Sequence, residues 1–292
     1  MGFGRVMMAW GLALLLASGA WAADGGTEPR TGADNAPLKL VVGVNDIYCK
    51  DSSCKCIANI ATRRYDEFCH KLREDYNIDL RMVYFTEPYE LDRAFLAGKF
   101  DAVLCKPWTV LRRPEGPGGR MVRVADLQDP SGNTGLWGIV IVLKDSAIRK
   151  LADISGRRVA CGQPDAREKH QDALALFHRE GIQIPPDKLV EKASCLECLD
   201  LLLKGEVDAA VISNYALTAD CAVDFTTPDA FRVLGKTEPI PLTSFMVDPE
   251  RVPRDGVRRL QAALSELSAR ALPPSMAGGG FVAPAPWKVE KQ

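Results

Sequence analysis

Cysteine is the residue type most able to do chemistry in this chain of 292 residues, which contains nine of them. Thiol sulfurs form disulfides, exchange them, or bind soft metal ions. Because nine is an odd number, complete pairing leaves at least one thiol free. Four of the cysteines end or follow predicted strands, and these are Cys49, Cys105, Cys161 and Cys195. The carboxyl ends of parallel strands share one edge of a sheet, so these thiols are expected near a binding edge.

That placement predicts two disulfides. Neighbouring parallel strands lie about 4.8 Å apart, which lets the Cα atoms at adjacent strand ends meet the distance that a disulfide needs. The expected pairs are Cys49 with Cys105 in the first half of the chain and Cys161 with Cys195 in the second. Further bridges would use four of the remaining five thiols, which are Cys54, Cys56, Cys69, Cys198 and Cys221.

A metal or redox site is the alternative use of the same residue type. Sulfur and imidazole nitrogen suit zinc or Cu(I), and the ligand set would be Cys49, Cys54, Cys56, Cys69 and His70. Cys195 and Cys198, with two residues between them, stand at the start of a predicted helix, where a thiol can bind metal or exchange disulfides. The spacing matches no defined zinc framework, so both interpretations remain open.

Aromatic and polar side chains occur at the same strand ends. Tyr48, Lys106, Trp108 and Trp137 lie at strand ends or crossover segments, and Asn214 and Tyr215 follow a strand over 207–212. Aromatic walls with a cation between them suit a small polar ligand. The alternatives are that both tryptophans pack a hinge and that Asn214 caps a helix.

Catalytic motifs are missing from the sequence. It has no nucleophile elbow, phosphate-binding glycine loop, His-Glu-x-x-His or dinucleotide fingerprint, and only three histidines. We therefore predict neither an enzyme nor a cofactor. The formal net charge of −1 gives no support to nucleic-acid binding.

The elements that position these residues alternate between strand and helix. The first half predicts strands over 38–44, 80–84 and 100–104 and helices over 63–76 and 88–97. The second half predicts strands over 138–143, 158–161, 188–191 and 207–212 and helices over 165–180 and 196–203. Extended segments over 231–234 and 243–247 and a helix over 257–270 follow. Such alternation indicates α/β architecture with parallel strands in two similar halves.

The N-terminal segment indicates export. Arg5 precedes an apolar run over 6–17, and Ala20-Trp21-Ala22 provides the small-x-small pattern of a cleavage site. We predict a signal peptide over 1–22, cleaved near Ala22, and a disordered leader over 23–36.

Four stretches resemble, in the same order, the type II periplasmic solute-binding proteins of the phosphate, phosphite and phosphonate class of ABC transporters. They are Gly-Lys-Phe-Asp-Ala-Val over 98–103, the apolar strand and Asp-Ser turn over 138–148, Leu-Ala-Asp-Ile-Ser-Gly-Arg-Arg-Val-Ala over 151–160, and Glu-Pro-Ile-Pro over 238–241. The resemblance implies a two-lobed fold, each lobe an open, mainly parallel sheet flanked by helices. Lobe 1 would comprise 37–133 and 252–292, and lobe 2 would comprise 134–251.

The resemblance also implies a function and a location. Such a protein is a non-catalytic periplasmic receptor that closes on a small solute and passes it to an ABC permease in the inner membrane. In phosphonate-binding relatives, hydroxyl residues at a helix N-terminus follow the first strand of the second lobe. The matching loop here, 162–170, has no hydroxyl; Gln163 and Asp165 stand there instead, and Arg167, Lys169 and His170 supply cations. We expect Asp165 to cap the helix.

The predicted ligand is therefore anionic or zwitterionic, and Gln163, Asp165 and Arg167 join the candidate binding residues. The alternative function is an accessory or sensor protein of a periplasmic redox enzyme system. The number of cysteines and the missing hydroxyls motivate that alternative.

Overall fold

The computed structural model describes residues 36–287 except 54–56, 58, 114–116 and 219–225. The described residues all belong to one compact unit. The predicted signal peptide, nearly all of the predicted leader, and the cysteines at 54, 56 and 221 lie outside the described residues. Within the described ranges, no helix is long and apolar enough to cross a membrane.

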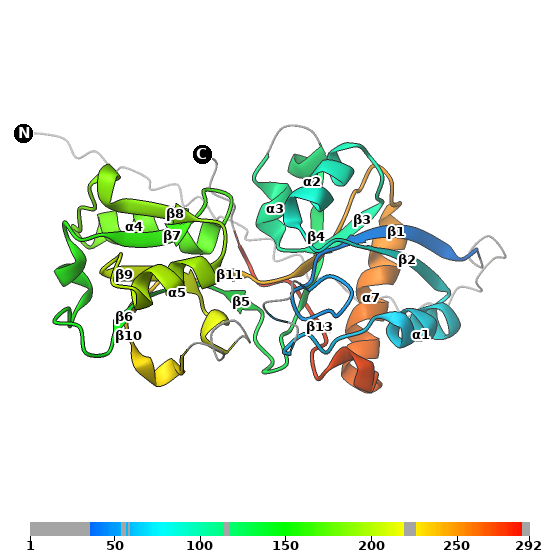
Figure 1. The fold of residues 1–292 in the computed structure, drawn as a ribbon. Coiled ribbons are helices and arrows are strands. Elements are labelled where there is room, and N and C mark those ends of the chain that lie inside the picture. Colours follow the sequence, from blue (N-terminus) through cyan, green and yellow to red (C-terminus); the bar gives the residue numbers. More distant parts are fainter. Residues whose placement is uncertain (1–35, 54–56, 58, 114–116, 219–225, 288–292) are drawn as a thin grey trace, which may run out of the picture. The chain divides into compact units, whose positions relative to one another are not determined.

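The first sheet has the strand order β13-β4-β12-β3-β1-β2 (Figure 1). Its parallel part consists of β1 (Leu38–Val44), β2 (Ile78–Tyr84) and β3 (Ala102–Cys105). Its antiparallel part consists of β12 (Ser244–Val247), β4 (Val122–Leu127) and β13 (Phe281–Val282). Strand β1 lies between β3 and β2, and from Leu40 to Val44 its side chains are apolar on both faces, as is usual for an interior parallel strand.

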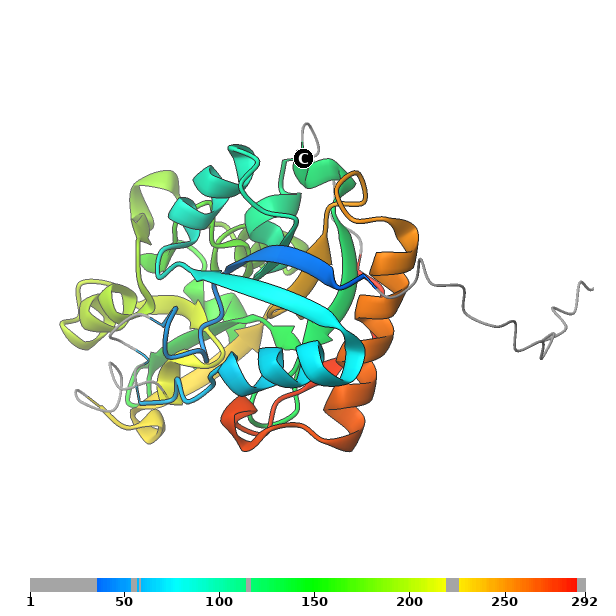
Figure 2. The same cartoon turned by 90° about the vertical axis from the view of Figure 1, so that its right-hand side faces the viewer.

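Helices cover both faces of this sheet. On one face lie α1 (Asp66–Tyr76) and α7 (Arg254–Arg270), which are side by side in Figure 2 and share an apolar cluster with β1. On the other face lie α2 (Pro88–Leu96) and α3 (Pro107–Leu111). The period-two alternation of β1 explains the division: Val42 packs toward α1 and α7, whereas Val41 packs toward α2.

The second sheet has the strand order β10-β6-β9-β7-β8 (Figure 1). Its strands are β10 (Phe231–Lys236), β6 (Gly138–Leu143), β9 (Ala209–Ser213), β7 (Val159–Gly162) and β8 (Leu189–Lys192). Helix α4 (Gln171–Arg179) packs on one face and α5 (Cys195–Leu203) on the other. Short 3₁₀ turns connect the elements: η2 (Pro117–Arg120), η3 (Leu151–Ile154), η4 (Arg167–Lys169), η5 (Pro186–Lys188), η6 (Ala216–Thr218), η7 (Pro228–Ala230) and η8 (Pro274–Met276).

Two short antiparallel strands, β5 (Gly135–Leu136) and β11 (Ile240–Pro241), pair where the chain passes between the two sheets. Leu242 N donates to Thr134 O at 2.8 Å beside this pair. Paired crossover segments of this kind can act as a hinge, because a few element-terminal residues absorb the change in φ and ψ.

The predicted α/β, two-lobed architecture is confirmed, with two differences. Both sheets are mixed, because β4, β6, β10, β12 and β13 pair antiparallel to their neighbours. Strand β12, which the sequence places in lobe 2, lies between β3 and β4 in the first sheet. The three apolar residues over 245–247 predict a strand but carry no signal for its sheet or direction, which long-range pairing decides.

Candidate functional site

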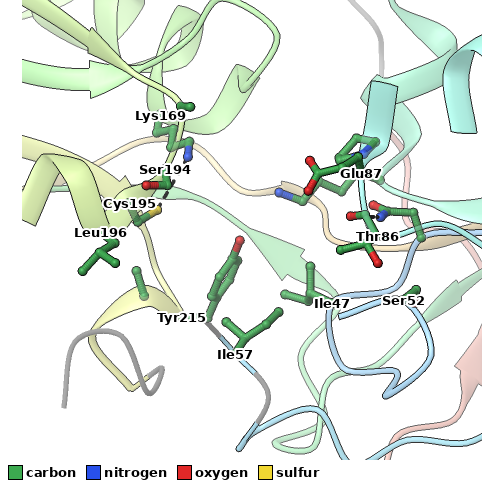
Figure 3. Close-up of a pocket in the computed structure, with 15 residues that line it drawn as sticks. Ile47, Ser52, Ile57, Thr86, Glu87, Lys169, Ser194, Cys195, Leu196 and Tyr215 are labelled. Atoms are coloured by element: carbon green, nitrogen blue, oxygen red, sulfur yellow. Dashed lines mark hydrogen bonds between the residues drawn. The ribbon is translucent and has the colours of Figure 1, made fainter. Parts of the chain in front are cut away.

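A cavity of about 420 Å³ lies where the carboxyl ends of the parallel strands of both sheets converge (Figure 3). Loops after β1, β2 and β3 supply one wall, and loops after β7, β8 and β9 supply the other. The lining residues are Asn45, Ile47, Ser52, Ile57, Thr86, Glu87, Pro88 and Lys106, and opposite them Lys169, Ala193, Ser194, Cys195, Leu196, Tyr215 and Ala216. This is the edge at which open α/β sheets bind ligands, and the volume suits a small molecule.

Lys106 joins the two walls by an ion pair. Its Nζ lies 3.5 Å from Oε1 of Glu168, a side chain that is 2% exposed and also accepts a hydrogen bond from Ser213 Oγ at 2.7 Å. Lys106 also lies over the ring of Tyr215, 5.9 Å from its centroid. Burial lowers the pKa of Lys106, but the Glu168 carboxylate more than offsets this, so the pKa lies above its usual value. Lys106 is therefore charged and already neutralised by a partner in the wall.

Lys169 is the second cation of the cavity and has a different environment. It is 8% exposed, and its Nζ lies 3.6 Å from Cys195 Sγ (Figure 3). Among the described residues, no carboxylate approaches its Nζ within ion-pair distance. Burial lowers the pKa of Lys169, yet the Cys195 sulfur and the Glu168 carboxylate raise it further, and the net shift is upward. A buried ammonium without a paired carboxylate favours an anionic guest.

Gly162, at the end of β7, makes room for Lys169. A Cβ at position 162 would lie 2.5 Å from Cγ of Lys169. We therefore expect Gly162→Ala to displace the ammonium and to weaken anion binding by about tenfold, measured by isothermal titration calorimetry. Gly135→Ala is the control, because a Cβ there meets no atom closer than 3.4 Å. Equal affinity in the two variants would contradict this role of Gly162.

Helix α5 begins at the cavity. Ser194 is its N-cap, with Ser194 Oγ accepting from Glu197 N at 3.2 Å and Glu197 Oε2 accepting from Ser194 N at 2.9 Å. The next residues, Cys195 and Leu196, line the cavity, and their N–H groups occupy the first two helical positions, which have no intrahelical acceptor. The positive end of the helix dipole adds to the charge of Lys169. Glu87, before α2, is the carboxylate of the opposite wall.

Two of the predicted binding residues line the cavity, and these are Lys106 and Tyr215. Two other predicted binding residues, Trp108 and Arg167, contact each other beside the cavity. The guanidinium of Arg167 lies 4.7 Å from the ring centroid of Trp108 and 5.6 Å from that of Trp287. Arg167 Nε also donates to Asp172 Oδ1 at 3.1 Å. Trp108 comes from α3 and Arg167 from η4, which follows β7 of the second sheet, so this stack contributes to holding the two walls together.

The other predicted binding residues lie away from the cavity lining. Tyr48 is buried in an apolar cluster with Leu136, Ile240 and Leu242. Trp137 packs against the cluster under α5, and its backbone N donates to Asn214 Oδ1 at 3.2 Å.

The loop after β7 differs from its predicted form. Gln163 and Asp165 are exposed. The helix expected over 165–180 is split into η4 and α4, with His170 rather than Asp165 before the first residue of α4. The turn-forming Gln163-Pro164-Asp165 segment accounts for the later start, and the split places Lys169 at the cavity.

Neither predicted disulfide is present. Among the described residues, Cys49, Cys69, Cys105, Cys161, Cys195 and Cys198 are free thiols. Cys49 belongs to the cluster under α1 and α7, whereas Cys105 belongs to the cluster under α2 and α3. Cys161 faces the α4 side of the second sheet, and Cys195 packs on the α5 side. The two strands of each expected pair are adjacent, as predicted. The two thiols of each pair nevertheless lie on opposite faces of the sheet, so they do not meet.

Two of the five predicted metal ligands, Cys54 and Cys56, lie outside the described residues. Cys69 and His70 line a surface hollow of about 360 Å³ beside α1 and β2, and His70 Nε2 lies 3.1 Å from Glu74 Oε1. Burial raises the pKa of Cys49 to about 11 and that of Cys69 to about 12, so both favour the protonated thiol over a metal-binding thiolate. The described part of the chain contains no group of three or more His, Cys, Asp or Glu side chains able to hold a metal ion.

Several residues that line the cavity were not predicted as binding residues, and the sequence around only one of them contains a pattern that could have indicated it. The Ser-x-x-Glu pattern of 194–197 is a capping box, and it would have placed Ser194 at the start of the helix, beside Cys195 at the binding edge. Thr86 and Glu87 follow β2 with no such pattern. Lys169 was named only as one of three cations of its loop.

A family model described as the phosphonate ABC transporter periplasmic substrate-binding protein matches residues 58–285. The chain belongs to this family. Its members are periplasmic substrate-binding proteins, so the predicted function of solute capture for ABC-type uptake is confirmed at the level of the family. The comparisons give no support to the redox-accessory alternative. No curated protein matches the chain in sequence.

Solved structures of similar fold agree with this assignment. The XAC2383 protein of Xanthomonas citri bound to ATP is 17% identical with a TM-score of 0.61, covering 85% of this chain and 92% of its own. PhnD1 of Prochlorococcus marinus in complex with methylphosphonate is 13% identical with a TM-score of 0.58, covering 85% and 93%. A phosphonate-transporter binding protein of Pseudomonas aeruginosa is 12% identical with a TM-score of 0.56, covering 84% and 82%. At these identities, the likeness concerns the fold.

The ion pair of Glu168 predicts how stability depends on pH. Burial raises the pKa of Glu168, but Lys106, Lys169 and Ser213 more than offset this, so the pKa lies below its usual 4.5. A carboxyl whose pKa is lowered by folding contributes stability that is present above 4.5 and is lost as the pH falls through the folded-state value. Glu168→Gln is therefore expected to lower the free energy of unfolding at pH 7, with a difference that shrinks below about pH 4.5. Urea unfolding at several pH values measures this, and a difference independent of pH would contradict it.

Proposed function

We propose that this protein captures a small anionic or zwitterionic solute in the cavity between its two sheets and delivers it to an ABC permease of the inner membrane. The observation that carries the anionic character is Lys169, a buried ammonium that faces the cavity with no paired carboxylate among the described residues. An anion there would gain charge-assisted hydrogen bonds from Lys169 and from the N-terminus of α5.

The opposite wall supports a zwitterionic guest as well. Glu87 lies at the start of α2 across the cavity from Lys169 (Figure 3). A solute with an anionic group at one end and an ammonium at the other would satisfy both walls. Lys106 and Tyr215 would contact the middle of such a ligand, because both line the cavity.

The remaining parts of the proposal concern location and chemistry. The N-terminal pattern over 1–22 supports export with cleavage near Ala22. Family membership supports the permease as partner and a receptor without catalytic activity.

Thermal unfolding with a panel of small solutes tests this function. The panel contains inorganic phosphate, phosphite, methylphosphonate, 2-aminoethylphosphonate, sulfate and an uncharged sugar as control. A ligand that binds only the folded chain at one hundred times its Kd stabilises it by about 2.7 kcal/mol, which raises Tm by several degrees. We expect such a rise for at least one anion and none for the sugar. A flat response to every anion would contradict the proposal.

A further inference from the structure

Two thiols stand three residues apart in the wall of the cavity, at the start of α5. Cys195 lines the cavity, and Cys198 lies beneath it with no exposed surface. Helical residues three apart have Cβ atoms about 5–6 Å apart, whereas a disulfide needs about 3.5–4.5 Å. The first turn of a helix lacks part of its hydrogen bonding, so Cys195 can move the ~1 Å that bonding requires.

The two sulfurs have different partners. Cys195 Sγ lies 3.6 Å from Lys169 Nζ and accepts a hydrogen bond from Ser213 N at 3.4 Å. Cys198 Sγ donates to Cys161 O at 3.5 Å. Within the described part of the chain, Cys195 Sγ is the one hydrogen-bond acceptor of Lys169 Nζ. The Cys195 sulfur therefore accepts the hydrogen bond that the Lys169 ammonium would otherwise donate to an incoming anion.

We propose that Cys195 and Cys198 form a reversible thiol–disulfide site that sets how strongly the cavity binds an anion; this rests on the proposed function. In the reduced chain, Lys169 donates to the Cys195 sulfur. In the disulfide, that sulfur turns toward Cys198, and the buried ammonium loses its acceptor. Because a buried charge without a partner is costly, the oxidised chain gains more from an anion in the cavity.

The oxidant is a disulfide, either of a small molecule or of an exported thiol oxidase. The Cys195 sulfur attacks one oxidant sulfur, the oxidant S–S bond breaks, and the departing thiolate takes up the Cys195 proton. The Cys198 sulfur then attacks Cys195 in the mixed disulfide, and the second thiolate leaves with the Cys198 proton. The chain loses two electrons and two protons, and the oxidant becomes two thiols. Burial raises the pKa of Cys198 to about 12, which leaves the accessible Cys195 to attack first.

Peptide mapping tests whether the disulfide forms. The full mature chain is equilibrated with oxidised or reduced glutathione, alkylated and digested with trypsin, which cuts after Lys192 and Lys204. The resulting peptide, 193–204, contains these two cysteines and no other. In oxidised wild type we expect this peptide to be two hydrogens lighter and unalkylated. In Cys198→Ser the mixed disulfide cannot be resolved, so the peptide should carry glutathione on Cys195. Cys69→Ser, a thiol outside the cavity, should behave like wild type.

Calorimetry with inorganic phosphate and with methylphosphonate tests the coupling. We expect the oxidised chain to bind at least one of them about tenfold more tightly than the reduced chain. Cys195→Ser, which lacks the attacking thiol, should show no change with oxidant, and Lys169→Gln should abolish the difference. Failure of the disulfide to form, or equal affinity of both redox forms, overturns this proposal and leaves the proposed function standing. If neither form binds any anion of the thermal panel, the proposed function fails, and the coupling fails with it.

Discussion

Replacement of Arg63 by leucine is expected to lower the free energy of unfolding by about 3–5 kcal/mol, the usual cost of breaking a buried ion pair on one side. Arg63 Nη1 donates to Asp46 Oδ2 at 2.7 Å, and the two side chains are 1% and 0% exposed. Tyr65 Oη donates to the same oxygen at 2.8 Å, and Arg63 Nη2 donates to Gln128 O at 2.5 Å. The variant leaves the Asp46 carboxylate buried without its cation.

The neighbouring Arg64 provides the matched control. Its ion pair with Asp66 spans 3.5 Å between side chains that are 61% and 76% exposed. Exposed pairs contribute about 0–1 kcal/mol, so Arg64→Leu should leave the free energy of unfolding nearly unchanged. Urea denaturation of both variants measures the contrast, and similar losses in the two would contradict a structural role for the buried pair.

The Arg63 network also shapes the cavity. Asp46 N donates to Ser52 Oγ at 3.1 Å, and Ser52 Oγ donates to Asp46 O at 2.8 Å. Ser52 lines the cavity, as do Asn45 and Ile47 on either side of Asp46. The buried ion pair therefore fixes the loop after β1 that forms part of the binding wall.

Lys169→Gln is expected to weaken binding of the anion selected by the thermal panel by about 10–100-fold, because charge-assisted hydrogen bonds contribute about 1.5–3 kcal/mol. The fold should persist, since the variant removes a buried charge rather than leaving one unpaired. Calorimetric titration measures the affinity, and the melting temperature without ligand verifies folding.

Lys204→Gln is the control for that variant. Lys204 belongs to the same lobe, at the end of α5 away from the cavity, and pairs on the surface with Asp200 at 2.7 Å. We expect this variant to bind the anion as wild type does. Equal affinity of Lys169→Gln and Lys204→Gln would contradict the assignment of Lys169 as the anion-binding cation.

The sequence predicted the parallel core of each lobe well, for a physical reason. Among the parallel strands, β1 has the predicted bounds and β7 lies one residue later than predicted, because short apolar runs bounded by polar residues have few other solutions. The antiparallel strands were harder, since β4 and β13 carry short or mixed patterns and depend on partners far along the chain. Strand β12 was found as a strand and placed in the wrong lobe for the same reason.

The site was predicted in outline rather than in detail. Strand ends indicated Lys106 and Tyr215, because topology alone brings such residues to one edge. The position of Lys169 in the cavity depends on the split between η4 and α4 and on the space that Gly162 leaves for its side chain. Both are properties of the packed loop, and no sequence pattern indicates them. The cysteine pairs failed because Cys49 lies in the loop after β1 and Cys195 is the first residue of α5, where the period-two alternation of a strand no longer fixes the face.

A crystal structure of the chain with the tightest-binding anion of the thermal panel tests the central claim most directly. The account predicts the anion between the two sheets, with its oxygens within hydrogen-bond distance of Lys169 Nζ and of the backbone N–H groups of Cys195 or Leu196. An anion bound at another surface, with the cavity free of it, would contradict the assignment of this cavity as the binding site.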